Sequence, residues 1–171
     1  MKTVTILFFA LIAFGCAPSE KSNTTSMSSA NTDNTPKVTG IGGIFFKSQD
    51  PQGTSQWYGE NLGLAIDGFG SPFEFRNANR PDEINYLRWS PKEDTSSYFV
   101  PSDREFMINY RVQNIEGLVE QLRSNGVTIV DTIEEYEYGK FIHIMDPEGR
   151  KIELWEPVDS FLTKLGGETT K

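Results

Sequence analysis

Two stretches of this sequence repeat the same order of elements, and this repeat constrains the fold more than any other feature. Residues 43–64 and 107–127 each combine an apolar strand-like run, a residue suited to begin a helix, a helical stretch and a glycine. Asn114, which would begin the second helix, lies 64 positions after Asp50, its counterpart in the first (114 − 50). A strand and a helix repeated at one spacing indicate a duplicated unit within one domain.

The helix boundaries of both stretches carry clear signals. Asp50 before Pro51 and Asn114 before its helix are side chains that can accept hydrogen bonds from free backbone N–H groups, and proline suits the first helical position. Gly63 and Gly126 can adopt the left-handed conformation that ends a helix. The second helix also has an apolar stripe at helical spacing, which predicts a buried face. This stripe consists of Ile115, Leu118, Val119 and Leu122.

Each predicted helix is followed by strand-like segments, so the order strand-helix-strand-strand-strand occurs twice. The segments are residues 65–67, 73–76 and 84–90 in the first half, and 128–133, 140–145 and 150–155 in the second. This order predicts an α+β fold of two tandem βαβββ modules, at about residues 38–95 and 103–158.

The last two segments form a predicted hairpin with a definite register. Residues 146–149, Asp-Pro-Glu-Gly, suit a type I turn followed by a glycine bulge. Such a turn places His143 opposite Glu153, on one face of the sheet. The alternating isoleucine and leucine residues between them then cover the other face.

With the stretch from Phe45 to Leu64 opening the first module and the stretch DPEGRKIELWEP, residues 146–157, closing the second, the chain resembles the vicinal oxygen chelate superfamily. That superfamily includes glyoxalases, bleomycin-resistance proteins, extradiol dioxygenases and an acyl-CoA epimerase. The resemblance covers residues 38–158 and implies that the paired modules form a curved eight-stranded cup that holds a ligand.

The resemblance also implies where a metal would bind. The four family positions fall on Gly43, Arg88, Met107 and Glu153. Glycine has no side chain, arginine is cationic and methionine offers a soft thioether, so only Glu153 is an ordinary ligand. Divalent metals need several oxygen donors, or three to four histidine, cysteine or carboxylate donors. The sequence therefore predicts no divalent metal and no other cofactor.

The side chains expected to face the cup suit a small organic ligand, because they combine aromatic walls with a few polar groups. Besides the family positions they include Phe45, Tyr86, Asn109, Arg111 and Trp155.

Two charged groups at the centre of the cup have two interpretations each. Arg88 could hold an anionic oxygen of the ligand, or could form a salt bridge with Glu153 that replaces the metal. His143 beside Glu153 could act as a catalytic acid–base pair, or could be a core histidine satisfied by its neighbour.

The N-terminal residues point to export. Residues 1–16 have the layout of a bacterial lipoprotein signal, with a short apolar run that ends at Cys16, the only cysteine. Cys16 would carry the lipid, residues 17–37 would form a flexible Ser/Thr/Asn-rich tether, and residues 159–171 a C-terminal tail. This predicts a protein anchored by its lipid to the bacterial cell envelope; an ordinary cleaved signal would instead make it secreted.

The function remains open among three classes. The first is binding of a small organic molecule in a metal-free cup. The second is a lyase or isomerase that moves a proton next to a carbonyl, with His143 or Glu153 as base. The third is an envelope interaction module with a vestigial cup. The formal charge of −8 argues against a nucleic-acid partner, and one chain with both modules suits a monomer or a homodimer.

Overall fold

A computed structural model of the protein describes residues 33–78 and 80–171, which belong to one compact unit. The predicted signal with Cys16, and the predicted tether up to residue 32, lie outside the described residues. The described part contains a seven-stranded sheet and three α-helices. In chain order the elements are β1 (Lys37–Ser48), α1 (Pro51–Leu62), β2 (Ser71–Asn77), β3 (Arg80–Glu93), the 3-10 turn Ser97–Phe99, β4 (Phe106–Gln113), α2 (Ile115–Ser124), β5 (Glu134–Tyr136), β6 (Gly139–Met145), β7 (Lys151–Pro157) and α3 (Asp159–Leu165).

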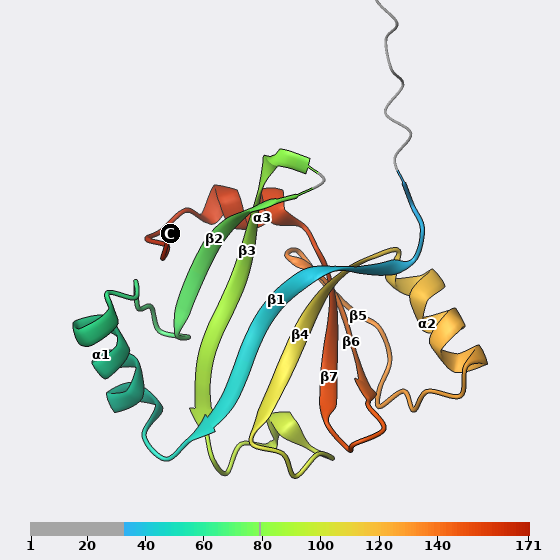
Figure 1. Ribbon diagram of the computed structural model, residues 1–171, viewed down its shortest axis with the longest axis horizontal. Helices are drawn as coiled ribbons and strands as arrows, with labels where there is room; N and C mark the ends of the chain where they lie inside the picture. Colours follow the sequence, from blue (N-terminus) through green and yellow to red (C-terminus); the bar gives the residue numbers. More distant parts are fainter. Residues whose placement is uncertain (1–32, 79) are drawn as a thin grey trace, which may run out of the picture. The chain divides into compact units, whose positions relative to one another are not determined.

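The order of the strands confirms the duplicated α+β architecture. Across the sheet the strands follow the order β2-β3-β1-β4-β7-β6-β5 (Figure 1). In each module the first strand pairs in parallel with the last, β1 with β3 and β4 with β7. The two modules join where β1 and β4 pair antiparallel at the centre. One continuous sheet thus receives side chains from both modules.

The number of strands differs from the predicted eight. Residues 65–67 do not form a strand but enter a tight turn with an isolated bridge between Asp67 and Gly70. Gly70 has φ 123°, a conformation that favours glycine and that turns the chain directly into β2. In the second module the strand predicted at 128–133 is reduced to one isolated bridge at Ile129, and the strand β5 begins only at Glu134.

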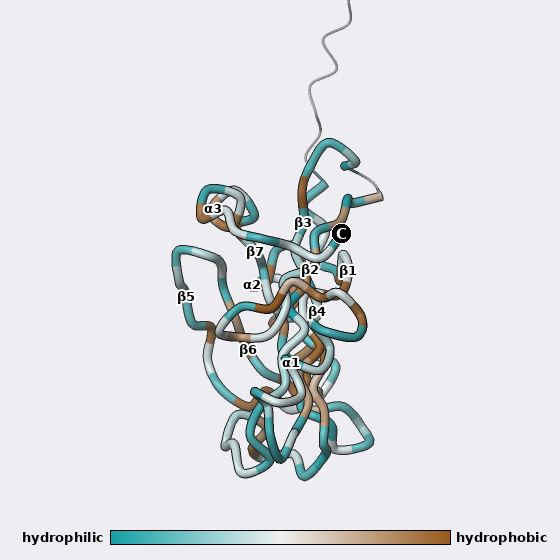
Figure 2. The backbone as a smooth tube through the Cα atoms, turned by 90° about the vertical axis from the view of Figure 1, so that its left-hand side faces the viewer, coloured by the Kyte–Doolittle hydropathy of each residue, from teal (hydrophilic) through white to brown (hydrophobic). Residues whose placement is uncertain are grey.

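Residues near the C-terminus lie where the first module lacks its strand. Thr170 pairs with the outer edge of β2: its N–H donates to Pro72 O at 2.8 Å, and its carbonyl accepts from Glu74 N at 3.0 Å. The segment expected only as a tail therefore forms α3 and returns to the sheet. Figure 2 shows α3 and β5 standing off the central strands on the same side.

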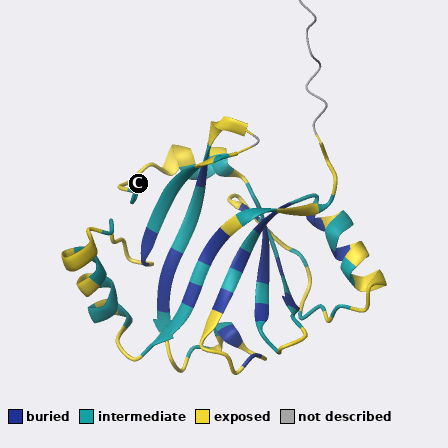
Figure 3. Ribbon diagram, in the orientation of Figure 1, coloured by how far each residue is buried: buried dark blue, intermediate teal, exposed yellow. Residues whose placement is uncertain are grey.

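The main apolar cluster lies between α2 and the strands of the second module. Ile115 and Val119 of α2 are buried, and Leu118 and Leu122 pack against the same cluster, as the apolar stripe predicts. Asn114 caps this helix by accepting a hydrogen bond from Gly117 N at 3.1 Å. By contrast, none of the residues 51–62 of α1 is buried (Figure 3). Among the described residues, no helix has the length and apolar character that a membrane span requires.

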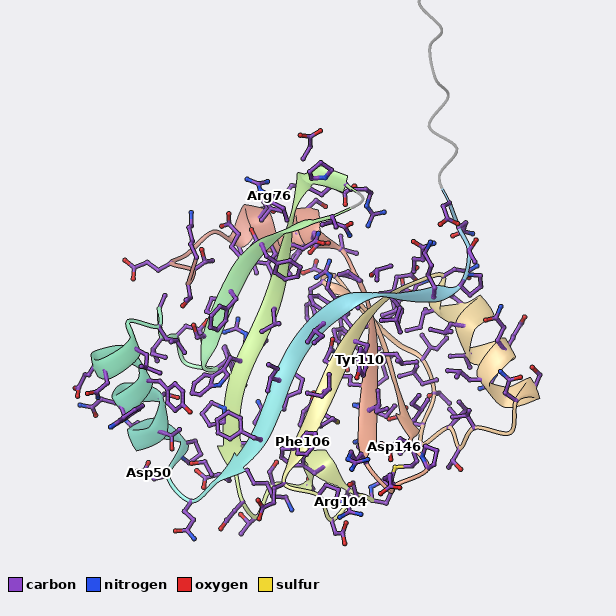
Figure 4. All side chains as sticks on the ribbon, in the orientation of Figure 1. Asp50, Arg76, Arg104, Phe106, Tyr110 and Asp146 are labelled. Carbon is purple, nitrogen blue, oxygen red and sulfur yellow. The ribbon has the colours of Figure 1, made fainter. Side chains whose placement is uncertain are left out.

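The predicted hairpin has the expected register. His143 lies opposite Glu153 in the β6–β7 pairing. Asp146 N donates to Arg150 O at 2.9 Å, and Gly149 has φ 76°, as the glycine bulge requires. Figure 4 places Asp146 at the turn between these strands. The register matters for function because it brings a histidine and a carboxylate together on the face that carries the cup.

Candidate ligand-binding site

One face of the sheet carries a cavity of about 810 Å³. Strands of both modules contribute to its lining, and residues 162 and 165–169, from α3 and the segment after it, close part of its edge. Most of the side chains that the sequence assigns to the cup line this cavity. They are Phe45, Tyr86, Arg88, Asn109, His143, Glu153 and Trp155.

Three predicted cup residues do not line the cavity. Met107 is 1% exposed and packs with Phe45 and Phe99 in a small apolar cluster. Gly43 lies against the ring of Phe45, where an added Cβ would meet the ring at 2.7 Å. Arg111 supports the wall from behind: its guanidinium carbon lies 5.1 Å from the centre of the Trp155 ring, and it forms an ion pair with Asp159. Ligand contact by these three residues is not favoured by this geometry.

Glu153 is the centre of a buried polar cluster. It is 3% exposed and accepts hydrogen bonds from the Tyr98 hydroxyl and from Asn109 Nδ2, the latter at 2.8 Å. His143 Nε2 lies 3.3 Å from the same carboxylate. A buried carboxylate requires such donors, because taking an unpaired charge out of water is costly.

His143 lies between two carboxylates. Its Nδ1 is 2.6 Å from Asp131 Oδ2, and its Nε2 faces Glu153. Burial acts to lower the pKa of His143, but the hydrogen bond and charge of Glu153 and the hydrogen bond of Asp131 outweigh it, so the pKa lies above its ordinary value. An imidazolium, with both nitrogens protonated, can donate to both carboxylates at once.

The sequence did not reveal two members of this cluster, Tyr98 and Asp131. Tyr98 comes from the 3-10 turn between the modules, and its ring meets the Phe45 ring edge-on at 5.5 Å. Burial and the charge of Glu153 raise the pKa of Tyr98, so its hydroxyl remains a donor. Asp131 lies in the loop before β5. Neither residue belongs to a strand or an α-helix, so no strand or helix periodicity links them to Glu153.

The predicted salt bridge between Arg88 and Glu153 is wrong. Arg88 instead pairs with Asp67 in the turn before β2, with 2.6 Å between Nη1 and Oδ2. Asp67 comes from the segment that was expected to be a strand, and its turn brings the carboxylate to the guanidinium. The three donors around Glu153 satisfy its carboxylate without arginine.

A wall of aromatic rings extends from the cluster to the edge of the cavity. Phe141 and Trp155 stack with an interplanar angle of 10° and 5.7 Å between ring centres. Tyr136 and Tyr138 stack at 5° and 5.2 Å, and all four rings line the cavity. The two tyrosines are partly exposed and add flat apolar surface to the cup.

The donors at the family metal positions do not fit a divalent metal. Glu153 is the only carboxylate among them, and its oxygens are already hydrogen bonded. Each nitrogen of His143 faces a carboxylate rather than a shared centre. Within residues 33–78 and 80–171, no three His, Cys, Asp or Glu side chains converge in a way that could hold a metal ion.

The strand order and the pairing of the two modules are those of the vicinal oxygen chelate fold. No protein-family model matches the sequence, and no curated protein does either. Solved structures do match. Methylmalonyl-CoA epimerase from Streptomyces coelicolor, a variant in complex with 2-nitronate-propionyl-CoA, has a TM-score of 0.52 at 13% identity, over 71% of this chain and 99% of that chain.

Two further matches have lower TM-scores. Methylmalonyl-CoA epimerase from Mycobacterium tuberculosis has a TM-score of 0.45 at 22% identity, over 74% of this chain and 93% of that chain. A glyoxalase/bleomycin resistance protein/dioxygenase superfamily member from Vibrio splendidus has a TM-score of 0.43 at 15% identity, over 71% and 99%. The match with the Streptomyces coelicolor structure, at 13% identity, supports the fold alone and leaves the activity open.

Proposed function

We propose that this protein binds a small organic molecule in its cup without a metal, and that a lipid on Cys16 anchors it to the bacterial cell envelope. The observation that carries the proposal is the cavity of about 810 Å³, which both modules line with aromatic rings and a few convergent polar groups. Ligand pockets of this size and composition bury most of the surface of a small molecule. One chain supplies the whole lining, so a monomer suffices and a homodimer is compatible.

The engagement and burial of Glu153 favour binding over catalysis. A general base needs an accessible lone pair within reach of the substrate proton. The carboxylate of Glu153 instead accepts from Tyr98 and Asn109 and faces His143, and it is almost completely buried. His143, held between two carboxylates, has a pKa above its ordinary value, because their hydrogen bonds outweigh its burial. The cluster is better suited to hold the floor of the cup rigid than to exchange protons.

An enzyme remains the second candidate because of one observation: His143 Nε2 lies 3.3 Å from Glu153. A lyase or isomerase reaction next to a carbonyl would use this pair as acid and base. A proton-transfer activity whose pH–rate profile disappears in Glu153→Gln would establish this function. The third candidate, a vestigial cup, is less well supported, since Arg88, Tyr86 and Trp155 line the cavity rather than fill it.

The test is to purify the protein without chelators and examine it by native mass spectrometry and elemental analysis. A copurified organic mass, with metal far below one equivalent, supports the proposal. The variant Tyr136→Ala removes a ring of the cup and should weaken retention of that mass. Trp57→Ala is the matched control, because Trp57 is similarly exposed, at 54% against 46%, but lies on α1 away from the cavity lining. One equivalent of zinc, nickel, iron or manganese bound beside Glu153 would overturn the metal-free proposal.

A further inference from the structure

We infer that the ligand is a flat organic acid with a single negative charge, whose carboxylate pairs with Lys92 and whose body lies against the rings of the cup. This inference rests on the proposed function, because it names the chemical class that the same cavity would select. It moves the anion-binding role from Arg88, where the sequence suggested it, to a lysine that no motif marks.

Lys92 presents a half-buried ammonium group to the cavity. It lies near the end of β3, and its Nζ is 5.9 Å from the centre of the Phe45 ring and 5.5 Å from that of Tyr98. Among the described residues, no carboxylate forms an ion pair with this ammonium group, and no hydrogen bond is found for its Nζ. Ring faces attract a cation but stabilise it less than a carboxylate does.

The environment of Lys92 is one that an anion would improve. Burial lowers the pKa of Lys92, as expected for a sheltered ammonium group that faces aromatic rings rather than a carboxylate. The charge of Glu153 acts on Lys92, but this carboxylate is already bonded to Tyr98 and Asn109. A ligand carboxylate at Nζ would supply the missing counter-charge, and a charge-assisted hydrogen bond in a sheltered site contributes strongly to affinity.

The other cations around the cup are engaged in the described part of the chain. Arg88 is paired with Asp67 at 2.6 Å, and His143 with Asp131 at 2.6 Å. Arg111, behind the wall, is paired with Asp159. Lys92 is thus the cation of the cup that is available for a ligand.

The rest of the lining limits the charge and the shape of the ligand. Glu134 and Glu168 line the same cavity, and the protein has a formal charge of −8, so a ligand with several negative charges would be repelled. The stacked pairs Tyr136–Tyr138 and Phe141–Trp155 present flat apolar surfaces that favour planar rings. A small aromatic monocarboxylate meets both conditions.

The experiment compares two probes of equal shape, 2-naphthoate and the uncharged 2-naphthamide, by calorimetric titration of the full chain. Lys92→Met should weaken 2-naphthoate about tenfold, the usual effect of losing a hydrogen bond to a charged group, and should change 2-naphthamide little. Lys92→Arg should retain most of the preference for the carboxylate. Lys47→Met is the matched control, since Lys47 also lies over a ring, 5.7 Å from Phe99, but does not line the cavity.

The outcomes separate this inference from the proposed function. If 2-naphthamide binds as well as 2-naphthoate, and Lys92→Met weakens both equally, the cup binds organic molecules but the charge assignment is wrong. If Tyr136→Ala also leaves both probes unaffected, they bind elsewhere and the inference fails. Failure of both probes to bind at millimolar concentration would count against the inference, while a copurified organic mass would still uphold the proposed function. Far-UV circular dichroism of each variant checks that a loss of binding does not reflect unfolding.

Discussion

The hydrogen bond from Tyr98 to Glu153 makes the sharpest prediction about how this cup is held together. The variant Tyr98→Phe keeps the ring, with its edge-on contacts to Phe45 and Phe99, and removes only the hydroxyl that donates to the carboxylate. Glu153 is then left with Asn109 and His143 as donors in a site where it is 3% exposed. At this low exposure, water replaces a lost donor only poorly.

The magnitude follows from the kind of bond that is lost. Removing one partner of a hydrogen bond to a charged group costs about 1.5–3 kcal/mol. We therefore expect the free energy of unfolding to fall by about 2 kcal/mol. For a unit of this size, about 4 °C is lost per kcal/mol, so the midpoint of thermal unfolding should fall by about 8 °C. Urea denaturation followed by tryptophan fluorescence measures the first quantity, and circular dichroism the second.

The control is another tyrosine-to-phenylalanine change. Tyr86 donates to Thr163 Oγ1 at 3.2 Å in an exposed position, so Tyr86→Phe should cost less than about 0.5 kcal/mol. In a Glu153→Gln background the cost of Tyr98→Phe should shrink, because a neutral amide needs the donor less than a carboxylate does. A loss below about 0.5 kcal/mol for Tyr98→Phe, or an undiminished loss in the Glu153→Gln background, would refute the assignment of this bond as the main support of the buried charge.

Three further predictions concern the histidine, its partner and the core. The pKa of His143 is raised in the folded state. Its contribution to stability is therefore fully present below the ordinary pKa of about 6.5 and is lost as the pH rises through the folded pKa. His143→Gln should flatten this decline in the free energy of unfolding, measured from pH 5.5 to 8.5. Asp131→Asn removes one of the two carboxylates and should lower the pKa of His143, which proton NMR can follow directly since the chain has a single histidine. An unchanged pKa would show that Asp131 does not act on the imidazole. Ile115→Ala, at a fully buried position of α2, should cost about 3 kcal/mol in urea denaturation, whereas Leu165→Ala, 66% exposed, should cost less than about 0.5 kcal/mol.

The parts of this fold that the sequence predicted are those in which the signal is local. The helix caps Asp50 and Asn114 act within three residues of themselves, through Gly53 N and Gly117 N. The register of the β6–β7 hairpin depends on its own turn, so the turn chemistry at Gly149 was sufficient to bring His143 opposite Glu153. Most of the side chains that the sequence assigned to the cup then line the cavity.

The parts that were wrong or missed depend on contacts between distant segments. The residues before β2 were expected to form a strand, but the edge of β2 that such a strand would cover pairs instead with Thr170, roughly one hundred residues later in the chain. A strand needs a partner edge as well as suitable residues, and the sequence does not show which segment reaches the edge first. The same turn supplies Asp67 to Arg88. Glu153 then pairs with Tyr98 instead, and Lys92 has no ion-pair partner among the described residues. The pairing of Thr170, rather than residues 65–67, with the edge of β2 therefore changes which cation of the cup is available to a ligand. For this reason the charge pattern of the site could not be predicted from its strands alone.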